Sequence, residues 1–295
     1  MRHTLFDPRI CTLGEGALWH PERGQAFWFD ILGKRLLSRH QGRELSWQFD
    51  EPVSAAGWID RDSLLIASAS ALFRFHLGSG AREPLVALEA DRPGNRSNDG
   101  RADPWGGFWI GTMGLDASPG AGAIYRWFDG RLERLRDGMD IPNAICFDPA
   151  GRHAYFADTA RQIVWRQPLD ARGWPVGEPA VYLDLTGTDQ HPDGAVTDAR
   201  GNFWNARWGS GTLVCHAPDG TRIDSVTLPS AQVSCPAFIG ENLDRILVTS
   251  AAEGLDGAQD GRTWLVLPDG ARGLAEPRVR PVSYTHLTLP TSGLV

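Results

Sequence analysis

The chain repeats one short pattern six times: an apolar strand core, a turn, and a second strand that carries a basic or aromatic side chain. The spacing between successive cores is 37, 44, 46, 49 and 43 residues, and the cores begin at Phe27, Leu64, Phe108, Ala154, Phe203 and Ile246. A period of roughly 40–50 residues with several short strands per unit is typical of a β-propeller. We therefore predict an all-β fold, a six-bladed β-propeller, whose blades collect polar side chains around one central channel.

The repeats predict a single propeller domain over residues 1–280, followed by a non-native tail over residues 281–295. The run from Pro281 to Ser292 has no counterpart in the repeats and resembles a sequencing-library adapter translated in frame. The native chain is then expected to diverge near Arg280. Loss of its own end is expected to weaken closure of the last blade, because a propeller relies on a completed ring.

Charge and composition exclude several classes of partner. The net charge is −7 with both signs interspersed and no basic block, which argues against nucleic acid and anionic membranes. No apolar run approaches the ~18–20 residues of a membrane span, and the start of the chain lacks the apolar core of a secretory signal. We therefore expect a soluble, cytoplasmic protein. Its widely spaced cysteines are expected to be reduced and mostly buried: Cys11, Cys146, Cys215 and Cys235.

Common catalytic signatures are absent from the sequence: there is no GxSxG elbow, HExxH pair, Walker A loop, GxGxxG fingerprint or EF-hand loop. The eight His residues are scattered, and none lies at metal-ligand spacing from another. His20 and His191 each precede a proline and are expected at the surface or rim.

Three oxygen-bearing side chains remain, in non-strand segments that lead into strands: Glu15, Asn143 and Asp193. Each has a similar place within its blade, so the three are expected to converge on the propeller axis. Two carboxylates and an amide oxygen there would form a site for a hard divalent cation. The segment from Asn95 to Gly100 has the same place in the third blade. Taken singly, each residue is also an ordinary turn residue.

The segments LGEG-LW, RxND-G, GTM, PN, PDG and SA occur in that order from about Leu13 to Ser250. In this respect the sequence resembles the regucalcin/gluconolactonase (senescence marker protein, SGL) family of six-bladed propellers, which are sugar lactonases. The resemblance implies one divalent cation in the central channel, held by Glu15, Asn143 and Asp193. It also implies that Arg96 and Asn98 contact the substrate. Asp99, next in the segment, is a further candidate for binding a hydroxyl and fits a turn role equally well.

The implied activity is metal-dependent hydrolysis of a sugar lactone to the aldonic acid, as in gluconolactonases and pentonolactonases. The cation would polarise the ester carbonyl, and Asp193 would be the general base. Ca²⁺ is the first choice of ion, with Zn²⁺, Mn²⁺, Mg²⁺ and Fe²⁺ as alternatives.

The sequence departs from the family pattern in three places. Ala144 stands where a glycine usually follows the Asn ligand. The segment from Thr249 to Ala252 lacks a basic residue. The acidic substrate-contact residue that some members carry after the GTM segment has no clear match between Leu115 and Gly122.

Three other functions fit parts of the sequence. A non-catalytic Ca²⁺-binding regulatory propeller of the regucalcin type would use the same three ligands. A scaffold for protein partners would need an exposed patch on the rim, and none is evident in the sequence. A propeller esterase acting on phosphotriesters or larger lactones would differ in substrate.

Overall fold

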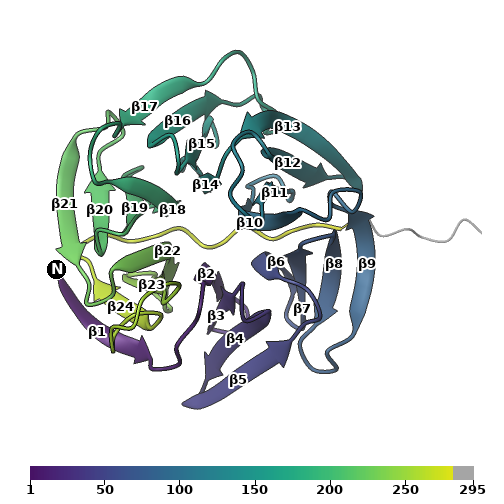
Figure 1. Ribbon diagram of the computed structural model, residues 1–295, viewed down its shortest axis with the longest axis horizontal. Helices are drawn as coiled ribbons and strands as arrows, with labels where there is room; N and C mark the ends of the chain where they lie inside the picture. Colours follow the sequence, from purple (N-terminus) through teal and green to yellow (C-terminus); the bar gives the residue numbers. More distant parts are fainter. Residues whose placement is uncertain (282–295) are drawn as a thin grey trace, which may run out of the picture.

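The protein is described by a computed structural model that covers residues 1–281, and its regular structure is β-strand alone over that range. Six four-stranded antiparallel sheets surround a central channel (Figure 1). The prediction of an all-β, six-bladed propeller is confirmed. Across residues 1–281 no helix is long and apolar enough to cross a membrane. The expected tail lies outside the described residues from position 282 onward, so the domain boundary near 280 stays a prediction.

Each blade runs outward from the channel in chain order. Blade one contains β2 (Gly14–His20), β3 (Gln25–Asp30), β4 (Arg35–His40) and β5 (Arg43–Gln48). Blade two contains β6 (Val53–Asp60), β7 (Ser63–Ser68), β8 (Ala71–His76) and β9 (Arg82–Ala87). Blade three contains β10 (Asn95–Ala102), β11 (Phe108–Gly114), β12 (Gly122–Phe128) and β13 (Arg131–Met139).

The second half of the ring follows the same plan. Blade four contains β14 (Pro142–Phe147), β15 (His153–Asp158), β16 (Ile163–Pro168) and β17 (Ala180–Asp184). Blade five contains β18 (His191–Thr197), β19 (Phe203–Trp208), β20 (Thr212–His216) and β21 (Arg222–Thr227). Blade six contains β22 (Gln232–Ile239), β23 (Arg245–Ala251), β24 (Thr263–Leu267) and, as its outer strand, β1 (Arg2–Asp7).

The ring is closed by its first strand. β1 pairs antiparallel with β24, so that Arg2 lies opposite Leu267 and Asp7 lies opposite Thr263. Both strands of this pair lie outside the predicted non-native tail over residues 281–295. The hydrogen bonds that complete blade six come from residues near the N-terminus.

Neighbouring blades are held together by apolar side chains that alternate along the strands. In β3, Phe27 and Phe29 pack toward blade two, whereas Ala26 and Trp28 pack toward blade six. Side chains of a strand point to opposite faces at every second residue, so one strand can serve two interfaces. Over the described residues the buried apolar side chains form six clusters, one at each interface between blades. The four cysteines are buried and unpaired, as expected.

The last described segment, residues 268–281, crosses the ring as an extended strap (Figure 1). Gly273 N donates to Leu243 O at 2.8 Å near blade six, and Val279 N donates to Trp58 O at 2.9 Å in blade two. Val279 is fully buried against residues of blades two and three. The innermost strands end at this strap face and begin at the opposite one, the cavity face.

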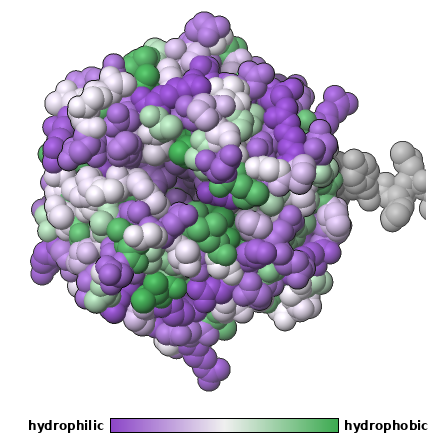
Figure 2. All heavy atoms as spheres, viewed as in Figure 1, coloured by the Kyte–Doolittle hydropathy of each residue, from purple (hydrophilic) through white to green (hydrophobic). Residues whose placement is uncertain are grey.

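Figure 2 shows a rim that is largely hydrophilic, with apolar residues in small groups.

Candidate functional site

A β-bulge in each innermost strand of blades one, three, four and five shapes the inner end of the blade. In β2, two residues between Glu15 and Leu18 face a single residue of β3, and the pairing in β14 shifts just after Asn143. Asp193 and Asn98 lie inside the bulges of β18 and β10. A bulge bends the strand and redirects its side chains. These residues were expected in non-strand segments; they lie within strands, at the irregular positions.

The bulges bring five of the six predicted site residues to one cavity of about 460 Å³ at the cavity face. Their side chains are nearly buried, with exposed fractions between 3% and 7%. They are Glu15, Arg96, Asn98, Asn143 and Asp193. Residues that lie up to 178 positions apart in the chain (15 to 193) thus share one space.

The sixth residue, Asp99, does not line the cavity. It is buried, and its Oδ2 accepts a hydrogen bond from Ile145 N at 2.7 Å. This contact joins β10 to β14 next to the bulge. The structure therefore places Asp99 against the backbone of blade four, where the resemblance had suggested a contact with a sugar hydroxyl.

A chain of hydrogen bonds fixes the amide of Asn143. Its Nδ2 donates to Thr159 Oγ1 at 2.7 Å, and its Oδ1 accepts from Asn98 Nδ2 at 2.9 Å. Thr159 Oγ1 in turn donates to Pro192 O at 2.7 Å, and Arg96 Nη1 donates to Asn98 Oδ1 at 2.7 Å. Because the amide nitrogen is engaged by Thr159, the oxygen of Asn143 is the atom that remains available as a ligand.

The backbone beneath Asp193 is held by a polar residue in the next strand. Asn205 Nδ2 donates to Asp193 O at 2.7 Å and to Gly194 O at 2.9 Å. Both carbonyls belong to the bulge, where the regular pairing with β19 is interrupted. Asn205 thus replaces the missing ladder contacts and keeps the bulge in one conformation.

Without a bound cation, the acidic side chains of the site repel one another and are costly to ionise. Burial, with repulsion from Asp99, raises the pKa of Glu15 to about 8. Burial raises the pKa of Asp99 to about 6. The pKa of Asp193 lies well above its ordinary value because of burial and then repulsion from Glu15 and Asp99. Burial lowers the pKa of the Arg96 guanidinium, which also lines the cavity. A bound cation would relieve the repulsion among these carboxyl groups.

The donor set matches a hard cation in its chemistry. Two carboxylates and an amide oxygen are the ligands that Ca²⁺ and similar ions prefer. Within residues 1–281 no group of three or more His, Cys, Asp and Glu side chains is placed to hold a metal ion. A site made of Glu15, Asn143 and Asp193 agrees with that finding, because its third ligand is an amide.

Several cavity residues were not found from the sequence. His191 was expected at the surface or rim; it lies opposite Trp208 in the β18–β19 ladder, and both line the cavity. His20 was also expected there, and this was wrong: it is fully buried, with Nε2 3.0 Å from Asp60 O. Asn205, which supports the site from β19, could have been recognised in the sequence, because it is a polar residue in an apolar strand core. Nothing in the sequence around Thr159 indicates its role.

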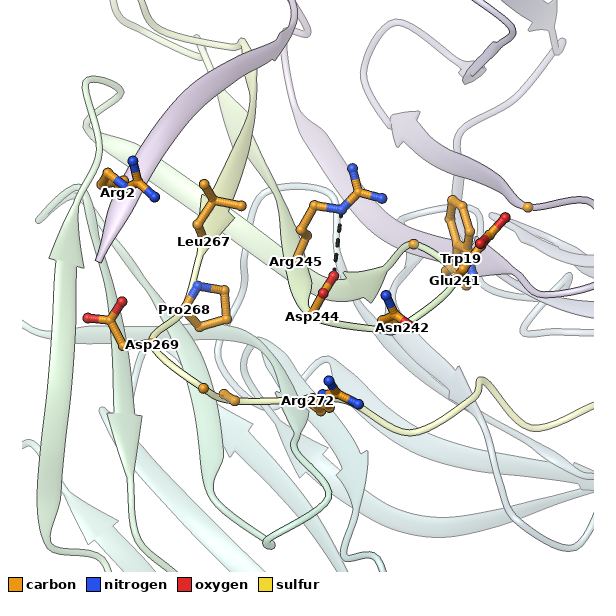
Figure 3. A pocket seen from close by; sticks show the side chains of 14 residues that line it. Arg2, Trp19, Glu241, Asn242, Asp244, Arg245, Leu267, Pro268, Asp269 and Arg272 are labelled. Carbon is orange, nitrogen blue, oxygen red and sulfur yellow. Dashed lines mark ion pairs between the residues drawn. The ribbon is translucent and has the colours of Figure 1, made fainter.

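A larger cavity, of about 850 Å³, lies at the strap face near blades six and one (Figure 3). Its charged side chains are partly or fully exposed and of both signs, and Arg245 Nε lies 3.8 Å from Asp244 Oδ1. None of the predicted site residues lines it. The cavity with buried polar groups, at the other face, is therefore the better candidate.

The chain is similar in sequence to known proteins. The family described as SMP-30/Gluconolactonase/LRE-like region matches residues 13–252. The L-arabinolactonase of Azospirillum brasilense is 38% identical over 260 residues, which cover 85% of each chain. The 6-deoxy-6-sulfogluconolactonase of Pseudomonas putida is 30% identical and covers 82% of this chain and 84% of its own.

The fold of a solved structure is also very similar. A calcium-binding protein, regucalcin, from Agrobacterium tumefaciens superposes with a TM-score of 0.91 at 42% identity. The match covers 94% of this chain and 96% of that one.

Proposed function

Because this chain belongs to the SMP-30/gluconolactonase/LRE-like family, we propose that it is a carboxylic ester hydrolase that opens a sugar lactone to the aldonic acid. The observation that carries the proposal is the meeting of Glu15, Asn143 and Asp193 with Arg96 and Asn98 in one cavity, at whose inner end all five side chains are nearly buried. Its volume of about 460 Å³ suits one small molecule, since such sites measure roughly 300–1,000 Å³. Relatives that are named as lactonases support the reaction type.

The side chains that would hold a divalent cation are Glu15, Asn143 and Asp193. Ca²⁺ is the first choice, because the ligands are all oxygens and a similar solved protein is described as calcium-binding; Zn²⁺, Mn²⁺, Mg²⁺ and Fe²⁺ are the alternatives. When bound, the cation would polarise the lactone carbonyl and stabilise the negative charge that develops on its oxygen. The fixed amide of Asn143 keeps its oxygen turned to the site.

The remaining roles belong to the protein's own groups. The carboxylate of Asp193 would accept the proton of the attacking water as the general base. Arg96 would donate hydrogen bonds to ring or exocyclic oxygens. Asn98 Nδ2 donates to Asn143 Oδ1 and to Pro142 O, so Asn98 would instead accept a hydrogen bond from a sugar hydroxyl through its Oδ1, and the two residues would together orient the lactone. Asn205, which holds the main chain of Asp193, would be a positioning residue.

A Ca²⁺-binding regulatory protein is the second candidate, favoured by the calcium-binding solved relative. It would use the same three ligands. It gives no role to Arg96, a buried cation at the cavity with no acidic partner in an ion pair within residues 1–281. A substrate contact would account for that residue, so the lactonase is preferred.

The test is a panel of sugar lactones, measured by proton release with metal-stripped and reconstituted protein. We expect hydrolysis by the reconstituted protein, and Asp193→Ala should lower kcat by at least about 10³-fold while the far-ultraviolet circular dichroism is unchanged. Glu241→Ala at the strap face is the control, since it also removes a carboxylate. Full activity of Asp193→Ala on every lactone that the parent hydrolyses would contradict the assigned chemistry.

A further inference from the structure

One acidic residue of the cavity has no part in the scheme above. Glu253 lines the cavity from the loop between β23 and β24, and its side chain is exposed at the mouth. The other acids of the lining, Glu15 and Asp193, lie deep and nearly buried. Glu253 therefore meets a different part of any bound molecule from the part that meets the two deep carboxylates.

The backbone holds Glu253 in place. Ala252 N donates to Cys11 O and Thr12 O, both at 3.1 Å, and Leu255 N donates to Ala252 O at 3.0 Å. The second bond closes a turn in which Gly254 has φ +70°, as a type II turn requires at that position. Glu253 thus projects from a defined turn that is tied to the segment before β2.

Arg96 is the charge that Glu253 complements. Its guanidinium is nearly buried and donates to Ser97 O at 2.9 Å as well as to Asn98. No carboxylate within residues 1–281 lies in ion-pair contact with it, and Glu253 is one of three acids whose charge acts on it. The two carboxylates that lie deep would be balanced by the cation. Arg96 and Glu253 then balance each other, with the negative charge at the mouth.

A sugar held by its carbonyl at the deep end must direct its remote end toward the mouth. A hydroxyl there could donate a hydrogen bond to Glu253, whereas a phosphate, sulfonate or carboxylate would be repelled by it. Relatives differ in this respect, because one at 30% identity is named for a sulfo-substituted gluconolactone. Charge at the remote end is thus a property on which members of the family can diverge.

We propose that Glu253 is a specificity-determining residue that restricts this protein to lactones with no negative charge at the end remote from the reacting carbonyl. The proposal rests on the proposed lactonase function and extends it to a substrate class, the uncharged sugar lactones.

The experiment compares kcat/KM for gluconolactone and for 6-phosphogluconolactone. The parent protein should prefer the uncharged lactone. Glu253→Gln should reduce that preference about 10- to 30-fold, because two unit charges about 4 Å apart in water interact by about 1 kcal/mol and a phosphate carries a charge of about −1.5 to −2. Glu253→Lys should reduce it further. Asp256→Asn is the matched control, because it removes a charge from the same loop outside the cavity lining and should leave the ratio unchanged.

Binding gives a readout that does not depend on turnover. Calorimetric titration should show that Glu253→Gln improves the affinity for sorbitol 6-phosphate relative to sorbitol, and that added salt reduces the difference. An unchanged substrate ratio in Glu253→Gln, or equal use of both lactones by the parent protein, would overturn the assignment. Failure of the parent protein to hydrolyse any lactone would instead refute the proposed function.

Discussion

Each end of the central channel holds an arginine from the same strand, and the two arginines differ in their hydrogen-bond and ion-pair partners. Arg96 and Arg101 both belong to β10, and both are nearly buried. At the strap face, Arg101 pairs with Glu276 through Nη1 and donates to Ile145 O at 3.3 Å, Ala195 O at 3.2 Å and Pro236 O at 3.3 Å. At the cavity face, Arg96 donates, among the partners within residues 1–281, only to Ser97 O and Asn98 Oδ1.

The difference separates stability from function. Burial alone would lower the pKa of Arg101, but Glu276 more than offsets this and raises it above the usual range. Arg101 thereby joins blades three, four, five and six to the strap, with its hydrogen-bonding capacity satisfied within the protein. Arg96 is held less completely, and a group that keeps donors for a ligand is typical of a binding site.

The largest expected effect is on stability at the strap face. Arg101→Met should lower the free energy of unfolding by about 3–5 kcal/mol, because it leaves Glu276 as a buried charge without a partner. Urea unfolding measures the loss, and kcat of the folded fraction should be retained. The double variant Arg101→Met/Glu276→Gln should recover part of the stability. A single variant as stable as the parent would refute the structural role.

At the cavity face the effect should be on activity. Arg96→Met should lower kcat/KM for the best lactone by about 10²-fold, near the upper range for one charged hydrogen-bond donor. Its stability should remain within about 1 kcal/mol of the parent, since no ion pair is broken. Steady-state kinetics together with urea unfolding separate the two quantities. A variant that unfolds easily but keeps its activity would reverse the comparison.

The two faces should also respond differently to pH in metal-free protein. The pKa of Glu15 is about 8 in the folded state against an ordinary value of 4.5. Between these values the folded state binds more protons than the unfolded state. The contribution of Glu15 to the free energy of unfolding is therefore fully present below pH 4.5 and is lost as the pH rises through about 8. One group contributes at most about 1.4 kcal/mol per pH unit.

Urea unfolding in the presence of a chelator, from pH 5 to 8, measures this slope. Glu15→Gln should reduce it and leave the part that is due to Asp99 and Asp193. Arg101→Met should not reduce it, because Glu276 without its partner is a buried charge at high pH and is neutralised at low pH. Added Ca²⁺ should reduce the slope, because a bound cation holds the carboxylates in their charged form. A slope that persists unchanged in Glu15→Gln would assign the titration to another group.

The smallest effect concerns the backbone beside Asn143. Ala144 has φ +57°, a left-handed conformation that costs a residue with a Cβ about 1 kcal/mol. Ala144→Gly should remove this strain but increase the freedom of the unfolded chain, so stability should change by less than about 1 kcal/mol. Thermal unfolding measures the shift. A large loss would show that the Ala144 methyl group is needed for packing among blade four's buried residues.

The repeats predicted the fold well because a propeller repeats locally. Each blade carries its own strands and turns, so the period of the apolar cores is visible in the sequence. The approximate position of Glu15, Asn143 and Asp193 within their blades was visible for the same reason. The bulges were not, since two residues facing one is a property of the pair of strands.

The strap and its contacts could not be predicted. Residues 268–281 carry no strand pattern, and their partners lie in blades far away in the sequence. Arg101 lies directly after the RxND-G segment, but its role was not predicted. Whether a side chain lies at the strap face or at the cavity face becomes clear only once the ring is closed. Thr159 was missed because its hydrogen bonds join two different blades.

The pairing of β1 with β24 has a consequence for how the protein is made. A growing chain can form blades one to five as they leave the ribosome, but β1, which is made before all of them, belongs to blade six. It can dock only after residue 267 has emerged. Ring closure is therefore a late step that depends on a segment of six residues made before the first blade, and deleting that segment should harm assembly more than its size suggests.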